Sequence, residues 1–183
     1  MARKRIEQWL EGFIVAHDIC PFARKPYTLG QVHIELVESS DEEDLTQAFL
    51  KALEQVVVTP RKELETTLLV ITQQLTDFDD FWSYYEWAQE LLEEGQVDGL
   101  IQLVGFHPDF RFAEQEDDAL ENFVNRAPFP IIQLLREESV SEAVAQHPDI
   151  TGIPERNSAY LRRFTRAALE KIVYVHHEGD STI

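Results

Sequence analysis

The chain of 183 residues contains a single cysteine, Cys20, which is followed by proline and lies close to Arg24 and Lys25. Nearby positive charge lowers the pKa of a thiol and favours the thiolate, which attacks electrophiles and binds metal ions. Cys20 is therefore a candidate nucleophile or redox thiol. A Cys-Pro pair also resembles motifs in which a thiolate ligates haem iron. The structural alternative is an unreactive, packed side chain, because free cysteine is among the most buried residue types.

A second reactive group, His107, directly follows an apolar run from Leu100 to Phe106. Imidazole titrates near neutral pH, so His107 could act as a general acid–base or as a metal ligand. Cys20 with His107, or with His33, could also form a metal or haem site. The structural alternative is that His107 caps a strand and bonds to a loop carbonyl.

The main candidate for anion binding is Arg126, which lies in a polar segment just before an apolar run. Its guanidinium could hold a substrate carboxylate or phosphate through two parallel hydrogen bonds. A salt bridge to Asp117 or Asp118 is the structural alternative. Nearby polar residues that could contact substrate are Asn122, Asn125 and Arg136.

Two glutamines, Gln102 and Gln133, interrupt otherwise apolar runs. Buried amides must be hydrogen-bonded, so we expect them to bond to each other, to the backbone or to the asparagine-containing loop. They would contact substrate only if both side chains point toward the strand ends.

The elements that must position these residues follow from apolar periodicity. Amphipathic spacing predicts helices over about 6–17, 41–57, 76–94, 140–145 and 154–173. β-Branched and apolar runs predict strands over 32–37, 66–72, 100–106 and 129–135. Ser40 and Thr76 are the predicted first residues of capping boxes. Residues 176–183 are predicted to form a flexible tail.

This alternation of helices and buried strands predicts a single α/β domain over residues 1–175. We expect a mainly parallel four-stranded sheet flanked by helices, with amphipathic N-terminal and C-terminal helices. Ligands of open α/β sheets bind beyond the carboxyl ends of the strands, which places His107 at the ligand-binding edge. Residues 107–127 lack a regular pattern, and a loop of that length is more often functional than idle.

The composition narrows the class of protein. The chain carries 34 acidic and 16 basic residues, a formal net charge of −18. Nucleic acids and anionic membranes are bound through excess Lys and Arg, so neither is an expected partner. No apolar run approaches the roughly 20 residues that span a bilayer, and no signal-peptide pattern is present, so we expect a soluble cytoplasmic protein. The sequence does not indicate an oligomeric state.

Several long, collinear motifs occur between about Trp9 and Leu169. They are Ile19-Cys-Pro-Phe-Ala23, Gly105-Phe-His-Pro-Asp-Phe110 with Phe112, Asn125-Arg-Ala-Pro-Phe-Pro130, Leu134-Leu-Arg-Glu137 and Ile153-Pro-Glu-Arg-Asn157. Together they resemble the bacterial and plastid DUF1415 family, a resemblance that implies no particular reaction. The family pattern often has His at Gln133 and Ser at Ala127. A metal site that needs that histidine would be weakened here, whereas glutamine could keep a hydrogen-bonding role.

These residues predict a small α/β enzyme that acts on a small anionic molecule. In this interpretation Cys20 is the nucleophile or redox thiol, His107 the general acid–base and Arg126 the clamp for the anion. Asn125 and Gln133 would orient the substrate. The cleft would have to bring these side chains together.

Two alternatives belong to other functional classes. One is a metal- or haem-binding module that uses Cys20 with His107 or His33. The other is a non-catalytic domain whose loop at 107–127 binds a protein partner. The second alternative predicts an exposed apolar patch, whereas an enzyme requires a concave pocket.

Overall fold

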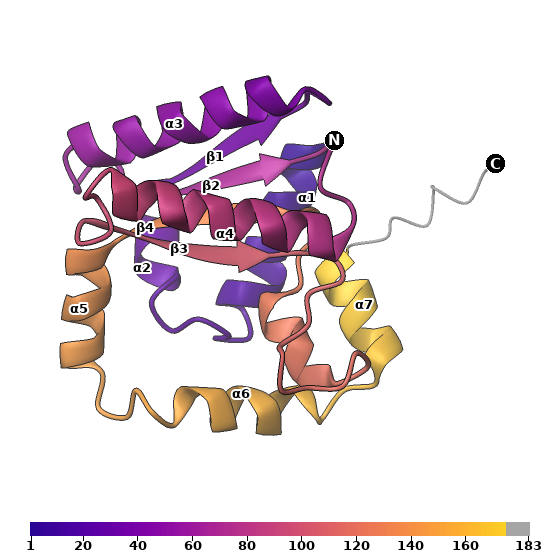
Figure 1. The fold of residues 1–183 in the computed structure, drawn as a ribbon. Helices are drawn as coiled ribbons and strands as arrows, with labels where there is room; N and C mark the ends of the chain where they lie inside the picture. Colours follow the sequence, from indigo (N-terminus) through magenta and orange to yellow (C-terminus); the bar gives the residue numbers. More distant parts are fainter. Residues whose placement is uncertain (175–183) are drawn as a thin grey trace.

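The computed structural model describes residues 1–174, and the predicted tail at 176–183 lies outside the described residues. Within them, strands and helices alternate along the chain (Figure 1). The strands are β1 (Val32–Val37), β2 (Thr66–Ile71), β3 (Ile101–Phe106) and β4 (Ile131–Arg136). The α-helices are α1 (Ala2–Trp9), α2 (Arg24–Thr28), α3 (Glu42–Val58), α4 (Phe78–Glu94), α5 (Glu137–Gln146), α6 (Ile153–Leu161) and α7 (Arg166–Tyr174). A π-helix (Leu10–Val15) continues α1, and a 3-10 helix (Leu120–Asn125) precedes β4.

The four strands form one mixed sheet in the order β1-β2-β4-β3. Strand β1 is parallel to β2, whereas β4 is antiparallel to both of its neighbours, so the prediction of a mainly parallel sheet is wrong. The reason lies in the connection from β3 to β4, which contains a short 3-10 helix and no crossover α-helix, and returns the chain beside β3. Strands β1, β2 and β3 still point the same way. The carboxyl ends of these three strands therefore lie at the same end of the sheet, and β4 starts at that end.

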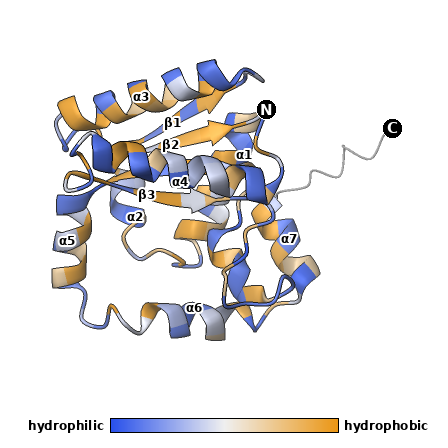
Figure 2. Ribbon diagram, viewed as in Figure 1, coloured by the Kyte–Doolittle hydropathy of each residue, from blue (hydrophilic) through white to orange (hydrophobic). Residues whose placement is uncertain are grey.

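Each face of the sheet is covered by its own layer of helices (Figure 1). Successive side chains of a strand point to opposite faces. Leu69 and Ile71 pack with residues of α3 and α4, whereas Leu68 and Val70 pack with residues of α1 and α7. Figure 2 shows the apolar colouring of β2 between these layers, in agreement with its full burial. The sheet thus separates two apolar clusters.

The predicted N-cap of each long helix is wrong by one residue. Asp41 and Asp77 are the N-caps of α3 and α4, in place of the predicted Ser40 and Thr76. Each aspartate accepts a hydrogen bond from the backbone N–H two residues later, at 2.8 and 2.9 Å respectively. A carboxylate accepts such bonds well and also favours the positive end of the helix dipole.

The predicted last helix is divided into α6 and α7. Thr165 begins a new helical turn, because its hydroxyl accepts a hydrogen bond from the backbone N–H of Ala168 at 3.2 Å. The break turns the chain, and α7 then packs against α1 and the 3-10 helix. As a result, the polar face of α7 lies beside the loop between β3 and β4.

Candidate functional site

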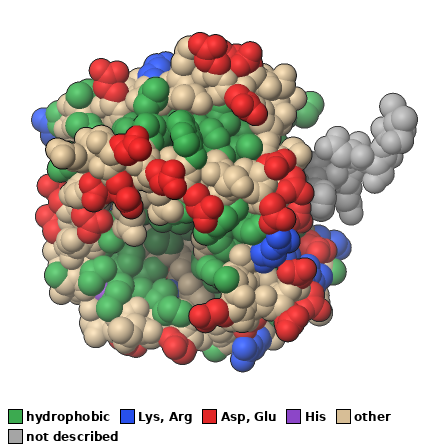
Figure 3. Space-filling view, in the orientation of Figure 1, with side chains coloured by type: hydrophobic (Ala, Val, Ile, Leu, Met, Phe, Trp, Pro, Cys, Tyr) green, Lys and Arg blue, Asp and Glu red, His purple; other side chains and the backbone are tan. Residues whose placement is uncertain are grey.

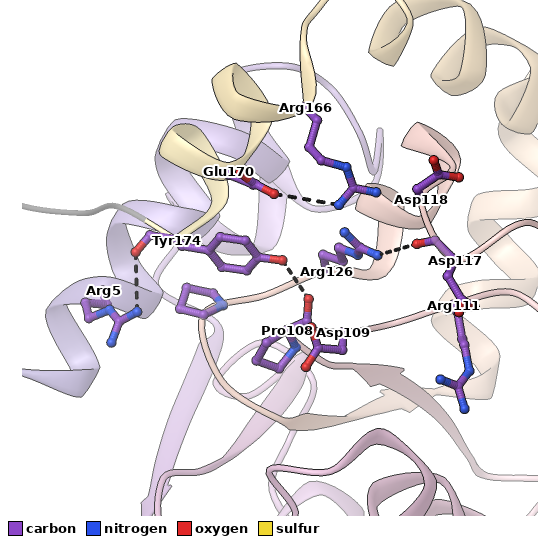
Figure 4. A pocket seen from close by; sticks show the side chains of 11 residues that line it. Arg5, Pro108, Asp109, Arg111, Asp117, Asp118, Arg126, Arg166, Glu170 and Tyr174 are labelled. Atoms are coloured by element: carbon purple, nitrogen blue, oxygen red, sulfur yellow. Dashed lines mark hydrogen bonds and ion pairs between the residues drawn. The ribbon is translucent and has the colours of Figure 1, made fainter.

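A pocket of about 630 Å³ opens at the edge of the sheet where β3 ends (Figure 4). Its walls come from the loop between β3 and β4, from α1 and from α7. The volume is within the range of sites for small molecules. The lining residues are Arg5, Pro108, Asp109, Arg111, Asp117, Asp118, Arg126, Pro128, Arg166, Glu170 and Tyr174.

Arg126 is the buried positive charge of this pocket, with 6% of its surface exposed. Its Nε donates to the carbonyl oxygen of Phe110 at 3.2 Å, and its Nη2 donates to that of Asp117 at 3.0 Å. The guanidinium carbon lies 4.7 Å from the centroid of the Phe123 ring. No carboxylate within residues 1–174 forms an ion pair with Arg126, so the alternative of a salt bridge to Asp117 or Asp118 is wrong.

Three further arginines line the pocket. Arg166 lies on α7, with its Nη1 3.6 Å from the carboxylate of Glu170 and its guanidinium carbon 5.8 Å from the Phe123 centroid. Arg111 pairs with Asp79 at the start of α4. Arg5 on α1 donates to the last described carbonyl of α7 at 3.4 Å.

These arginines are a local exception on an acidic molecule. Figure 3 shows several Lys and Arg side chains gathered on the right of the view, near α7, while Asp and Glu side chains are scattered over the rest of the visible surface. The pocket also contains the carboxylates of Asp109, Asp117, Asp118 and Glu170, so the formal charges of its lining balance.

Tyr174 closes the pocket from the end of α7. Its hydroxyl donates to the carbonyl oxygen of Pro108 at 2.6 Å. Burial raises the pKa of Tyr174 above its usual value, and the positive charge and hydrogen bond of Arg126 partly oppose that rise. The phenol is therefore neutral at physiological pH and ties α7 to the loop that follows β3.

His107 lies at the carboxyl end of β3, as predicted, but its ring is fully buried. Its Nε2 lies 3.0 Å from the carbonyl oxygen of Leu75, and its Nδ1 accepts a hydrogen bond from the backbone N–H of Asp109 at 3.0 Å. These contacts define a neutral ring that donates from Nε2. Burial lowers the pKa of His107 below its ordinary value, against a smaller opposing effect of the bond to Leu75. Both nitrogens already have partners, which favours the structural alternative.

Cys20 lies in the other apolar cluster, beneath α1, as a half-buried free thiol. Burial raises the pKa of Cys20, and hydrogen bonds from the backbone of Phe22 and Ala23 oppose the rise. The thiol is therefore mainly protonated at neutral pH. The ring of His107 packs against Phe81 of the α4 layer, 5.2 Å between centroids, so the sheet lies between the two side chains.

The two asparagines hold the pocket loop in place. Asn122 is buried, accepts from the backbone N–H of Phe112 at 3.1 Å and donates to the carbonyl oxygen of Glu116 at 2.9 Å. Asn125 donates to the carbonyl oxygen of Gly105 at 2.9 Å, on the unpaired edge of β3. Both side chains shape the pocket indirectly, and neither lines it.

The remaining predicted residues lie away from this pocket. Arg136, at the other end of β4, donates to the carbonyl oxygens of Thr59 and Leu64 at 2.6 and 2.9 Å. Gln133 donates to the hydroxyl of Thr66 at 3.0 Å, and Gln102 is exposed on the edge strand.

The structure shows no preformed metal centre in the part of the chain that it describes. Within residues 1–174, no group of three or more His, Cys, Asp or Glu side chains is placed to hold a metal ion. His33, one of the predicted ligands, lies instead 3.2 Å from the carboxylate of its neighbour Glu35. Among the same residues, no helix has the length and apolarity needed to cross a bilayer.

Sequence reasoning missed the residues that α1 and α7 bring to the pocket. Arg166, Glu170 and Tyr174 are each four positions apart, which places them on one face of a helix. That spacing is a local signal for a polar helix face. What the face contacts depends on the break between α6 and α7, which the periodicity did not predict.

Fold and site together define a mixed α/β protein with an arginine-lined pocket at the end of β3. Comparison with known families matches residues 1–171 to the family described as "Protein of unknown function (DUF1415)". The chain belongs to this family, as its motifs predicted. No curated protein and no solved structure matched the chain in the corresponding searches.

Proposed function

We propose that this protein binds a small anionic molecule, with a carboxylate or phosphate group, in the pocket formed by the β3–β4 loop, α1 and α7. The observation that supports the proposal most strongly is the state of Arg126. A buried charge is normally paired with an opposite charge, yet Arg126 is 6% exposed and bonds only to neutral groups among residues 1–174.

A second arginine, Arg166, makes the binding of an anion more favourable still. Arg126 and Arg166 both lie against the ring of Phe123, with guanidinium carbons 4.7 and 5.8 Å from its centroid. Two positive groups near one buried ring repel each other, and the carboxylate of Glu170 balances only Arg166. An anion placed between the guanidinium groups would give Arg126 the negatively charged partner that it lacks among residues 1–174.

The side chain of Arg126 is preorganised for such a ligand. The carbonyl oxygens of Phe110 and Asp117 fix the guanidinium plane of Arg126 through two of its five N–H groups. The side chain of Arg126 also donates a hydrogen bond to Tyr174, a further neutral group that holds it in place. Preorganised donors of this kind reduce the entropy that binding costs.

No bond-making step is assigned to Cys20 or His107 in this proposal. The two side chains lie on opposite faces of the sheet, and both hydrogen-bonding atoms of His107 are occupied. The same separation disfavours a shared metal or haem site. The loop at 107–127 forms a wall of a concave pocket, which favours a small ligand over a protein partner for this loop.

Thermal unfolding in the presence of small anions tests the proposal. Inorganic phosphate and succinate should each raise the midpoint above that in sodium chloride of equal ionic strength. A concentration of about 100 times Kd stabilises a folded protein by about 2.7 kcal/mol, which corresponds to roughly 5 °C or more for a chain of this size.

Variants then show whether the shift of the unfolding midpoint comes from binding in this pocket. Arg166→Gln should remove most of the shift, because Arg166 lines the pocket and is only half-buried on α7. Arg163→Gln is the matched control, since Arg163 is exposed and lies outside the pocket lining. The proposal fails if neither anion exceeds chloride, or if both variants reduce the shift equally.

A further inference from the structure

The outer surface of the α3–α4 layer carries a concentration of negative charge. These two helices contain ten Asp and Glu residues and a single Lys, a net charge of −9 within the formal −18 of the whole chain. All ten acidic residues are exposed. The excess is not needed to cap the helices, because Asp41 and Asp77 do that from positions outside them.

Between these helices runs an apolar stripe that the core does not fully cover. It consists of Leu50, Leu53 and Val57 on α3 and of Tyr84, Trp87 and Leu91 on α4. On each helix the three positions follow the i, i+3, i+7 spacing that places them on one face. Leu53, Tyr84 and Leu91 are partly buried and pack on the cluster beneath.

The other three members of this α3–α4 stripe remain exposed. Leu50 is 45%, Val57 41% and Trp87 37% exposed. Trp87 contacts both helices, with its ring 6.3 Å from that of Phe49 and 5.0 Å from that of Tyr84. In Figure 3, hydrophobic side chains lie between α3 and α4, with Asp and Glu side chains around them. Tryptophan and other large apolar groups inside a polar rim are typical of protein interfaces.

We propose that the α3–α4 stripe binds a Lys- or Arg-rich amphipathic segment of a partner protein. An apolar stripe of this spacing fits the apolar face of a helix laid along it, as in helix-in-groove recognition. The acidic rim selects the charge of that helix. Cationic side chains flanking its apolar face would meet carboxylates on both sides of the stripe.

Charge argues against the other occupants of such a surface. A second copy of this chain would bring the same acidic rim to the contact, and like charges across an interface are costly. Anionic lipid and nucleic acid are repelled for the same reason. The stripe also lies on the α3–α4 layer, away from the residues that line the arginine pocket, so this proposal does not depend on ligand binding there.

A designed peptide provides the probe. It is a helical peptide of about 14 residues with leucine along one face and lysine elsewhere, and its matched partner has glutamate in place of lysine. Trp82→Phe is introduced first, because Trp9 is buried and Trp87 then becomes the exposed reporter. The lysine peptide should shift the Trp87 emission to shorter wavelength with saturation, and the glutamate peptide should not.

Stripe variants decide whether the peptide binds where we propose. Leu50→Gln with Val57→Gln should raise Kd by about tenfold or more. Leu29→Gln, an exposed leucine outside the stripe, should leave Kd unchanged. Glu54→Gln with Glu90→Gln should weaken binding and reduce its dependence on salt, whereas Glu138→Gln on α5 should not.

Three results would overturn the inference. Equal binding of the lysine and glutamate peptides would remove the role of charge. An unchanged Kd in the Leu50→Gln and Val57→Gln variant would show that the peptide binds elsewhere. Sedimentation that shows a dimer, lost in that same variant, would assign the stripe to a second copy of the chain.

Discussion

The ring of His107 is held between two backbone groups and two aromatic side chains. Its nitrogens contact the main chain of Leu75 and Asp109, and its ring packs against Phe78 and Phe81. The result is a neutral imidazole that joins the end of β3 to the loop before α4. A histidine that follows the carboxyl end of a strand can thus have a structural role, even though its position matches that of many catalytic residues.

Stability should therefore fall in mild acid. Burial lowers the pKa of His107 in the folded state, while the unfolded chain titrates near 6.5. Above about pH 6.5 the His107 ring is neutral in both the folded and the unfolded state, so its burial does not reduce the free energy of unfolding. As the pH falls below that value, the unfolded state binds a proton first, and the free energy of unfolding decreases by at most about 1.4 kcal/mol per pH unit.

Urea unfolding at pH 7.5 and pH 5.5 checks this behaviour. His107→Gln should reduce the difference in the free energy of unfolding between the two pH values, whatever its own effect on stability. His147→Gln, on the connection between α5 and α6, is the control and should keep the wild-type difference. A His107→Gln protein with an unchanged pH dependence would contradict the assignment of a neutral, buried ring.

The thiol of Cys20 should react slowly in the native protein. Because burial raises its pKa, the thiolate fraction at pH 7.5 is smaller than in the unfolded chain. Alkylation by iodoacetamide, measured by mass, should be at least about tenfold slower than in urea. Faster alkylation of the native protein than of the unfolded one would restore the nucleophile hypothesis.

At the scale of elements, the strands were predictable and the direction of one of them was not. Strands such as 66–71 and 101–106 consist mainly of β-branched and apolar residues, and the prediction located them within one residue. Nothing in the run from Ile131 to Arg136 encodes whether it lies parallel or antiparallel to β3. That depends on how residues 107–130 return the chain, and the sequence predicted only an irregular loop there.

Close packing between β3 and α4 depends on a glycine. A Cβ atom at Gly105 would lie 3.2 Å from two ring carbons of Phe81 and 3.4 Å from the ring of Tyr85. Gly105→Ala should therefore force the α4 layer outward and destabilise the protein by about 1–3 kcal/mol. Chemical denaturation measures the change.

The matched control for Gly105→Ala is Gly99→Ala, because a Cβ there would meet nothing within 4 Å. Gly99→Ala should change the free energy of unfolding by less than about 0.5 kcal/mol. Equal effects of the two substitutions would show that packing against α4 is not the cause.

At the scale of the whole molecule, the pocket arises from segments far apart in the sequence. Arg126 was predicted as an anion-binding residue because it precedes an apolar run, and it does line the pocket. Its neighbours Arg5, Arg166 and Tyr174 could not be predicted, since they come from the two terminal helices. The bond between Tyr174 and Pro108, 66 positions apart, depends on how α7 packs.

The arrangement also explains how an acidic protein could bind the anion that we propose. The helices of the α3–α4 layer hold much of the negative charge on one side of the sheet. The four arginines gather at the edge where β3 ends, between α1 and α7. Fields from exposed charges are screened beyond about 8–10 Å at physiological salt, so the local groups dominate binding.

The most direct test of the central claim follows the arginine side chains themselves. In ¹⁵N-labelled protein, the Nε–H resonances of Arg126 and Arg166 can be assigned with Arg126→Lys and Arg166→Gln and followed during titration with inorganic phosphate or succinate. We predict saturable shifts of both resonances with one Kd, while the Nε–H resonance of Arg163 stays unchanged. Absence of saturation at Arg126 and Arg166, or an equal shift at Arg163, would contradict the claim that the pocket binds a small anion.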